Sequence, residues 1–158
     1  TKRTMKAMVC MKYGPPNVLQ LQEVEKPVVK DNEVLIQIYA TSVTAADYRI
    51  RGLNVPAGFG ILMRIAVGFR KPRKAILGMN LAGVVETVGK DVSLFKNGDQ
   101  VFGTSGMGFG AYAQYICMPE NSSLAIKPAK MTYAEAVADG IDCLVCMGLA
   151  QAVNRVKE

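Results

Sequence analysis

Alternation of apolar and polar side chains dominates the first third of the chain. The run VLQLQEVEK, residues 18–26, alternates regularly and predicts a half-buried β-strand. The apolar runs MKAMVCMKY, residues 5–13, and EVLIQIYATSV, residues 33–43, predict one strand on either side of it. Turn-forming sequences separate the three runs, so the pattern predicts an antiparallel meander. A short helix over residues 44–51, closing at Gly52, is predicted next.

Strand patterns return in the second half of the chain. LAGVVETVG at 81–89, QVFG at 100–103 after an Asn-Gly-Asp turn, and AYAQYICM at 111–118 each predict a strand, and Pro119 ends the last one. Between the two groups of strands, glycine and proline interrupt an apolar stretch at residues 53–77. That segment is predicted to be a long loop with one short helix.

The hydrophobic period changes after Pro128. Thr132 and Glu135 fit a capping box, in which the two side chains satisfy free backbone donors at a helix start. Apolar residues then follow helical spacing towards Val156, with a break expected at Gly140. The predicted fold is therefore a mainly β (α+β) body followed by a C-terminal helix.

Composition and charge narrow the class of protein. Half of the 158 residues are hydrophobic and 20% are charged, as in a soluble globular domain. The net charge is +6, but the basic residues are scattered except at residues 70–74, where no aromatic residues interleave. We therefore expect no nucleic-acid partner. Residues 1–6 do not resemble a signal peptide and no run is long enough for a transmembrane helix, so a cytoplasmic protein without membrane contact is expected.

The spacing of two cysteines raises the question of a metal site. Cys143 and Cys146 have the spacing of half a zinc site, but the chain has no histidine, and Cys10 and Cys117 fall on separate predicted strands. Core packing of reduced thiols is favoured over a metal site. The same lack of histidine excludes a Ser-His-Asp or Cys-His mechanism built from this chain alone.

Two further patterns have structural explanations. GMGFGA, residues 106–111, formally matches a dinucleotide-binding fingerprint, but a strand pattern follows it where the fingerprint requires a helix. A glycine hairpin or loop is predicted there instead. Asp47, in the short helix, is expected to cap or brace that helix.

Four ordered segments carry a resemblance to a known family. They are YGPPNVLQLQEVEKP, EVLIQIYATSVTAADYRIRG, ILGMNLAGVVETVGKDVSLFKNGDQVFG and GAYAQYICMPE. The chain resembles, over nearly its whole length, the GroES-like catalytic domain of zinc-independent medium-chain dehydrogenases/reductases of the quinone-oxidoreductase type. The resemblance implies a partly open β-barrel over residues 1–131. It also implies that the C-terminal helix, residues 132–158, would lead into a nucleotide-binding domain that the chain lacks.

The resemblance also assigns site residues. Zinc-dependent members have cysteine and histidine where this chain has Thr44 and Ala45, and histidine and glutamate where it has Met79 and Asn80, so no zinc is expected. Zinc-independent relatives usually carry asparagine at the position of Thr44, facing the nicotinamide and the substrate carbonyl. Thr44 keeps a hydroxyl that can stabilise a developing oxyanion, although it lacks the second donor of an amide.

Two more residues follow from the same resemblance. Tyr48, one helical turn beyond Thr44, is a candidate acid or polarising group if it faces the cleft between the domains. Val145 stands where relatives have a threonine that approaches the cofactor. The family usually has aspartate in place of Asn80, and that difference alters the local hydrogen-bond network.

The resemblance implies a function that needs more than this chain. A full-length parent would use NADP or NAD to reduce a small-molecule carbonyl, quinone or activated alkene by hydride transfer. The isolated chain is expected to bind no cofactor and to be inactive. Apolar residues of the terminal helix predict a homo-oligomer. The alternative is a stand-alone GroES-like binding or interaction module that has lost enzyme activity, which the unusual sequence at 137–147 favours; a co-chaperonin fits less well.

Overall fold

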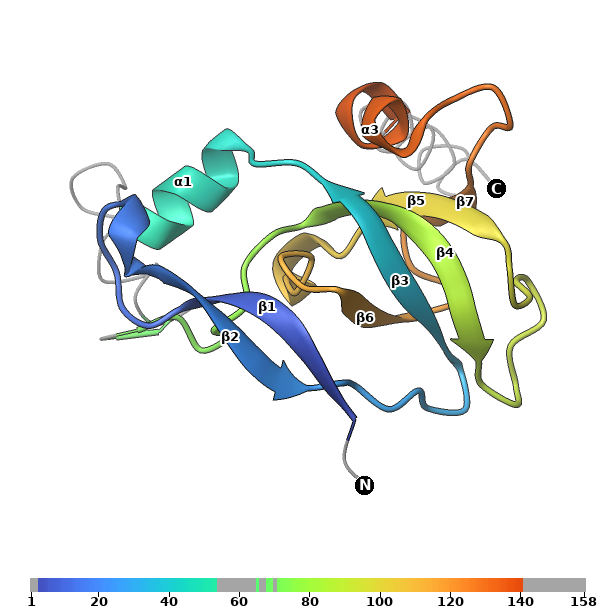
Figure 1. Ribbon diagram of the computed structural model, residues 1–158, viewed down its shortest axis with the longest axis horizontal. Helices are drawn as coiled ribbons and strands as arrows, with labels where there is room; N and C mark the ends of the chain where they lie inside the picture. The colour runs from blue at the N-terminus through green and yellow to red at the C-terminus, as the bar shows by residue number, and fades with distance from the viewer. Residues whose placement is uncertain (1–2, 54–64, 66–67, 70, 141–158) are drawn as a thin grey trace, which may run out of the picture.

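The protein is built mainly from β-strands arranged in two sheets (Figure 1). The computed structural model describes residues 3–53, 65, 68–69 and 71–140. Strands β1 (Thr4–Cys10) and β2 (Leu19–Glu25) form an antiparallel ribbon, joined through the 3-10 turn η1 (Pro16–Val18). Alternate side chains of β1 are buried and β2 is partly exposed, as the sequence pattern predicts for half-buried strands.

The second sheet has five antiparallel strands in the order β6-β3-β4-β5-β7. Their bounds are β3 (Glu33–Thr41), β4 (Asn80–Val88), β5 (Gln100–Thr104), β6 (Tyr115–Pro119) and β7 (Leu124–Ile126). The sheet curves without closing on itself, and the β1–β2 ribbon lies beside it (Figure 1). The prediction of a mainly β, partly open barrel is confirmed.

The predicted meander is wrong in its pairing. Strand β3 does not pair with β2 but with β4 on one side and β6 on the other. The physical reason lies in the burial of Val34, Leu35 and Ile36, three consecutive residues that are at most 6% exposed. A strand that is apolar on both faces belongs in the middle of a sheet, whereas the alternating β2 suits an edge.

The predicted strand over residues 111–118 begins too early. Strand β6 starts at Tyr115, because the preceding residues bond elsewhere. The N–H of Tyr112 donates to the carbonyl of Leu77, and its own carbonyl accepts from the N–H of Met8. This segment therefore ties the five-stranded sheet to the β1–β2 ribbon. Strand β7 was not predicted.

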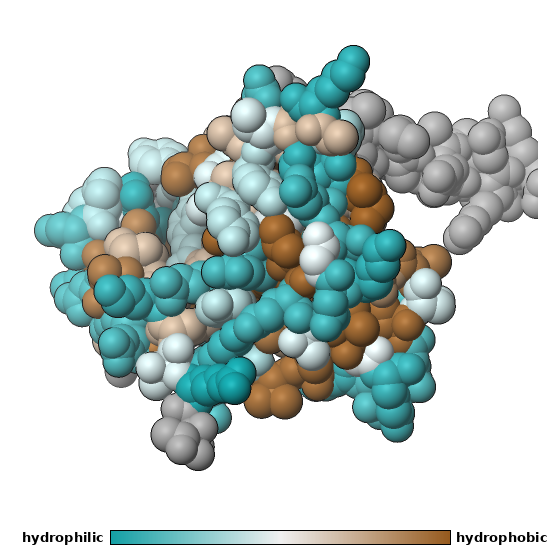
Figure 2. All heavy atoms as spheres, turned by 45° about the vertical axis from the view of Figure 1, so that its right-hand side comes forward, coloured by the Kyte–Doolittle hydropathy of each residue, from teal (hydrophilic) through white to brown (hydrophobic). Residues whose placement is uncertain are grey.

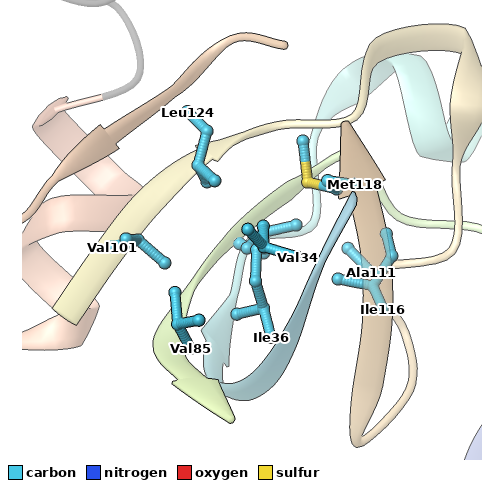
Figure 3. Packing of buried hydrophobic residues seen from close by; sticks show 9 residues of the cluster. Val34, Ile36, Val85, Val101, Ala111, Ile116, Met118 and Leu124 are labelled. Carbon is cyan, nitrogen blue, oxygen red and sulfur yellow. The ribbon is translucent and has the colours of Figure 1, made fainter. Parts of the chain in front are cut away.

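The main core lies inside the curved sheet. Its residues are mostly branched aliphatics, and those labelled in Figure 3 point toward one another: Val34, Ile36, Val85, Val101, Ala111, Ile116, Met118 and Leu124. Leu81 belongs to the same cluster. Each aliphatic side chain of this size contributes about 1.5–3 kcal/mol when it is fully buried. The core thus draws on all five strands of the sheet and on Ala111, before β6.

The two helix starts match the capping predictions, whereas the first helix ends one residue later than predicted. Helix α1 (Ala45–Gly52) includes Gly52, and its C-cap is Leu53 in the left-handed conformation, with φ of 52°. Helix α3 (Tyr133–Glu135) leads into the π-helical turn η3 (Ala136–Gly140). The N–H of Thr132 donates to Glu135 Oε2 at 2.7 Å, which confirms the predicted capping box.

Several predictions fall outside the described residues. They are the terminal helix beyond Gly140, the cysteine pair 143 and 146, and most of the loop at 53–77. Among the described helices, none is long and apolar enough to cross a membrane.

Gly83→Ala should destabilise the fold, because Gly83 lies in β4 directly against β3. A Cβ atom there would meet the carbonyl oxygen of Gln37 at 2.0 Å, and backbone atoms cannot move aside easily. We expect a loss of about 2–3 kcal/mol in the free energy of unfolding, measured by urea denaturation. Gly108→Ala is the matched control, since its nearest neighbour would be Ser105 Cβ at 3.6 Å. Equal stability of the two variants would contradict this account.

Candidate functional site

The candidate site lies where β3 ends and α1 begins. Thr44 is the N-cap of α1 and has an extended backbone, with φ of −104° and ψ of 167°. Its N–H and its hydroxyl both donate to Asp47 Oδ2, at 2.9 Å and 2.7 Å, and its Oγ1 accepts from the Asp47 N–H at 3.4 Å. The expectation that Asp47 caps the helix is confirmed. The hydroxyl hydrogen of Thr44 is consequently engaged by a carboxylate.

A second polar pair lies beside it, between the end of β3 and the start of β4. Asn80 Nδ2 donates to Ser42 Oγ at 3.1 Å. The hydroxyl of Thr41 donates to the backbone carbonyl of Asn80 at 2.7 Å, which joins Asn80 to β3. Asn80, which stands where the family usually has aspartate, therefore has a defined hydrogen-bond partner in Ser42. Ser42 itself was not singled out from the sequence, since a single serine after an apolar strand gives no signal.

Behind α1, a buried polar cluster joins the helix to the barrel. Asp47 is only 3% exposed. Asp47 Oδ1, Arg51 Nε and the phenol oxygen of Tyr112 are buried without a hydrogen-bond partner among the described residues. Burial raises the pKa of Tyr112 well above its usual range, and the negative charge of Asp47 raises it further. A Cβ at Gly78, where φ is 87°, would lie 2.4 Å from the Tyr112 ring, so glycine is required there.

Tyr48 lies one turn beyond Thr44, and its N–H donates to the Thr44 carbonyl at 3.2 Å. Its side chain is 52% exposed, and the Arg51 guanidinium lies over its ring at 5.6 Å. The structure therefore brings Thr44 and Tyr48 together on one helix start. Val145, the third predicted site residue, lies outside the described residues.

A mainly apolar cleft lies nearby but does not include the residues of this polar site. It has a volume of about 480 Å³ and lies between the β1–β2 ribbon, the end of β3 and the segment before β6. Leu21 and Val43 are among its lining residues, whereas Ser42, Thr44 and Asn80 are not. Leu21 and Val43 are 64% and 78% exposed. Apolar residues also reach the surface in patches between polar ones on the face shown in Figure 2.

The glycine-rich segment forms a loop, as predicted. Strand β5 precedes it, but the 3-10 turn η2 (Gly106–Gly108) follows, and the next regular element is strand β6. Phe109 has a positive φ of 51°, and its side chain is buried. The helix N-terminus that would hold a pyrophosphate does not follow this loop.

The thiols and metal-ligating groups offer no cluster within the described ranges. No group of three or more His, Cys, Asp or Glu residues there could hold a metal ion. Cys10 and Cys117 are free cysteines, Cys10 buried and Cys117 partly buried. Burial raises the pKa of Cys10, and it raises the pKa of Cys117 to about 11, so both thiols are held in their unreactive protonated form.

Known proteins of one family share this fold and sequence. Residues 30–128 match the family described as the alcohol dehydrogenase GroES-like domain. Quinone oxidoreductase from Sus scrofa is 34% identical over 142 residues, which are 89% of this chain and 39% of that protein. 2-Methylene-furan-3-one reductase from Solanum lycopersicum is 32% identical over 142 residues, 85% of this chain and 34% of that protein.

A solved structure of a quinone oxidoreductase has the same fold as this chain. Escherichia coli quinone oxidoreductase complexed with NADPH superposes with a TM-score of 0.66 and 27% identity, covering 87% of this chain and 37% of that one. The chain belongs to the alcohol dehydrogenase GroES-like domain family, and its resemblance to quinone oxidoreductases is confirmed. It spans about 39% of the length of the quinone oxidoreductase it matches.

Thr44→Val should weaken the start of α1, because valine keeps the shape of threonine but cannot accept from the Asp47 N–H or donate to its carboxylate. We expect a loss of about 1 kcal/mol in the free energy of unfolding, measured by urea denaturation. Thr44→Ser retains the hydroxyl and should stay close to the parent. A Thr44→Val protein as stable as the parent would show that the cap contributes nothing.

The buried Tyr112 phenol should make stability depend on alkaline pH. Because its folded pKa is raised, the unfolded chain releases the proton above about pH 10 while the folded chain retains it. The contribution is fully present below that pH and is lost as pH rises towards the folded pKa. Tyr112→Phe should therefore lose less stability than the parent between neutral and strongly alkaline pH. Parallel pH curves for the two proteins would contradict this expectation.

Proposed function

We propose that this chain is the substrate-side domain of an NAD(P)H-dependent oxidoreductase that reduces a small-molecule carbonyl, quinone or activated alkene. The observation that carries the proposal is the set of hydroxyl, amide and carboxylate groups at the β3–α1 junction, on a fold shared with quinone oxidoreductases. The names of the relatives support both quinone and alkene acceptors. The structure of the Escherichia coli relative with NADPH supports NADP, or NAD, as the cofactor of a full-length parent.

In this proposal, the cofactor supplies hydride when bound, and residues of the chain position the acceptor. Thr44 contacts the acceptor oxygen, and its hydroxyl can serve that oxygen by turning away from Asp47. Tyr48 is the candidate acid or polarising group, and Val145 is the candidate cofactor contact. Zinc does not fit, because Thr44, Ala45, Met79 and Asn80 offer neither thiolate nor imidazole nor carboxylate ligands.

The remaining parts of the proposal concern organisation. We propose that residues 1–131 are the substrate-side domain and that residues 132–158 lead into a nucleotide-binding domain. We further propose a cytoplasmic homo-oligomer. A stand-alone GroES-like binding module is the second candidate, and the engagement of the Thr44 hydroxyl by Asp47 favours it, since that proton is not freely available to a substrate.

NADPH oxidation separates the two candidates. We expect the protein encoded by the complete reading frame to oxidise NADPH only when a naphthoquinone or a conjugated enone is added, measured by NADPH absorbance. This chain alone should neither oxidise NADPH nor bind it, because the described loop lacks a pyrophosphate-binding helix start.

Two outcomes would contradict the proposal. Turnover by this chain alone would show that the division into domains is wrong. A complete protein that is folded but inactive with both acceptors would instead favour the binding module. Circular dichroism of each preparation is the control for folding.

A further inference from the structure

Hydride addition to a carbonyl carbon leaves a negatively charged oxygen, which needs a hydrogen-bond donor already in place. The Thr44 hydroxyl is not free to donate to such an oxygen. It donates to the carboxylate of Asp47 at 2.7 Å, and Asp47 is only 3% exposed. A hydrogen bond to a carboxylate is about twice as strong as one between neutral groups, so Thr44 must give up a strong bond to serve a substrate.

Ser42 has the opposite arrangement. Its Oγ accepts from Asn80 Nδ2 at 3.1 Å, and within the described part of the chain the Ser42 hydroxyl donates to no acceptor. A hydroxyl that already accepts one hydrogen bond is polarised and becomes a better donor. Its hydrogen is therefore available.

Asn80 is held firmly enough to orient Ser42. Its carbonyl accepts from the Thr41 hydroxyl at 2.7 Å, and its backbone is paired with Thr104 across the β4–β5 ladder. The Asn80 side chain therefore projects from a fixed backbone at the edge of two paired strands. That position favours one orientation of the Ser42 hydroxyl.

Ser42 is also close to the proposed substrate site. It precedes Thr44 by two residues and directly follows β3, and the backbone of Thr44 is extended. Thr41 and Val43 line the apolar cleft, whereas Ser42 and Thr44 do not. Side chains two residues apart on an extended chain lie on the same face, about 6–7 Å apart. Both side chains are partly buried. A substrate oxygen near Thr44 can thus be reached by Ser42.

We propose that Ser42 is a further catalytic residue, whose hydroxyl, held by Asn80, donates a hydrogen bond to the substrate oxygen during reduction. This inference rests on the proposed function. Hydride addition brings two electrons to the carbonyl carbon, the C–O π bond breaks, and its electron pair moves to the oxygen. Ser42 stabilises that oxygen by its hydrogen bond, and a proton from water completes the alcohol. With a quinone, the first product is a hydroxycyclohexadienone, which becomes the hydroquinone when the proton of the new C–H bond moves to the second oxygen.

The identity of residue 80 decides the direction of this hydrogen bond. The asparagine amide can donate to Ser42, whereas an aspartate carboxylate can only accept. Aspartate at this position would take the Ser42 hydrogen and leave the hydroxyl unable to donate to a substrate. Asn80→Asp is therefore a specific test of direction, because it changes the size of the side chain very little.

Steady-state kinetics of the complete protein give the first readout. We expect Ser42→Ala and Asn80→Asp each to lower kcat for quinone reduction about 100-fold, with the KM for NADPH unchanged. Ser42→Thr, which keeps a hydroxyl, should recover most of the activity. Ser122→Ala is the matched control, since the Ser122 hydroxyl donates to the Pro119 carbonyl in a surface turn.

Infrared spectroscopy of a bound carbonyl gives a second readout that needs no turnover. The complete protein is saturated with oxidised cofactor and with cyclohexenone, and the C=O stretch is recorded. We expect a shift to lower frequency in the parent and in Ser122→Ala, and its loss in Ser42→Ala and Asn80→Asp.

The two readouts distinguish a failure of the Ser42 proposal from a failure of the proposed function. If the parent reduces quinones and Ser42→Ala does so equally well with an unchanged stretch, Ser42 is not the donor and the proposed function stands. If the parent shows the shift but no turnover, the Ser42 donor stands and the proposed function fails. A parent with neither shift nor turnover overturns both.

Discussion

The burial of β3 on both faces is the constraint on which the rest of the structure depends. Val34, Leu35 and Ile36 are almost completely hidden, so the backbone around them can form hydrogen bonds only with neighbouring strands. Strands β4 and β6 provide those bonds on opposite edges of β3. Because β3 is fixed along its length, the residues that follow it leave the sheet at a defined point beside the first residue of β4. The polar groups of the candidate site are positioned by an apolar strand.

The sequence predicts the positions of the strands better than it predicts which strands pair with each other. Alternation over β2 and β-branched runs over β3 and β4 mark individual strands, since side-chain periodicity is a local property. Pairing is not local, and it depends here on which strand is buried on both faces. The misplaced start of β6 has a similar cause, because Tyr112 continues an apolar run while its backbone bonds to Leu77 and Met8. Strand β7 has only three residues, too few for a period to be recognised.

The candidate site was predictable where its contacts are local. Thr44 and Asp47 are three residues apart at a helix start, a spacing whose geometry favours reciprocal capping. Tyr112 reaches the same cluster from a distant part of the chain, over a glycine with positive φ at residue 78, and no local pattern announces that contact. Ser42 was missed for the same reason, since its partner Asn80 belongs to another strand.

Thr44 and Ser42 both carry a hydroxyl group, but their hydrogen-bond partners differ. Only the Ser42 hydroxyl therefore has a hydrogen available for a substrate. Asp47 is an acceptor and takes the hydrogen of Thr44, which leaves the Thr44 oxygen able to accept. Asn80 is a donor and leaves the hydrogen of Ser42 available. A reductase must bind an acceptor oxygen before reaction and a hydroxyl after it. A junction with one available donor and one available acceptor suits both forms, since a carbonyl oxygen can accept from Ser42 and a product hydroxyl can donate to Thr44. Aspartate in place of Asn80 would leave the hydrogens of both hydroxyls held by carboxylates, which suits only the product form.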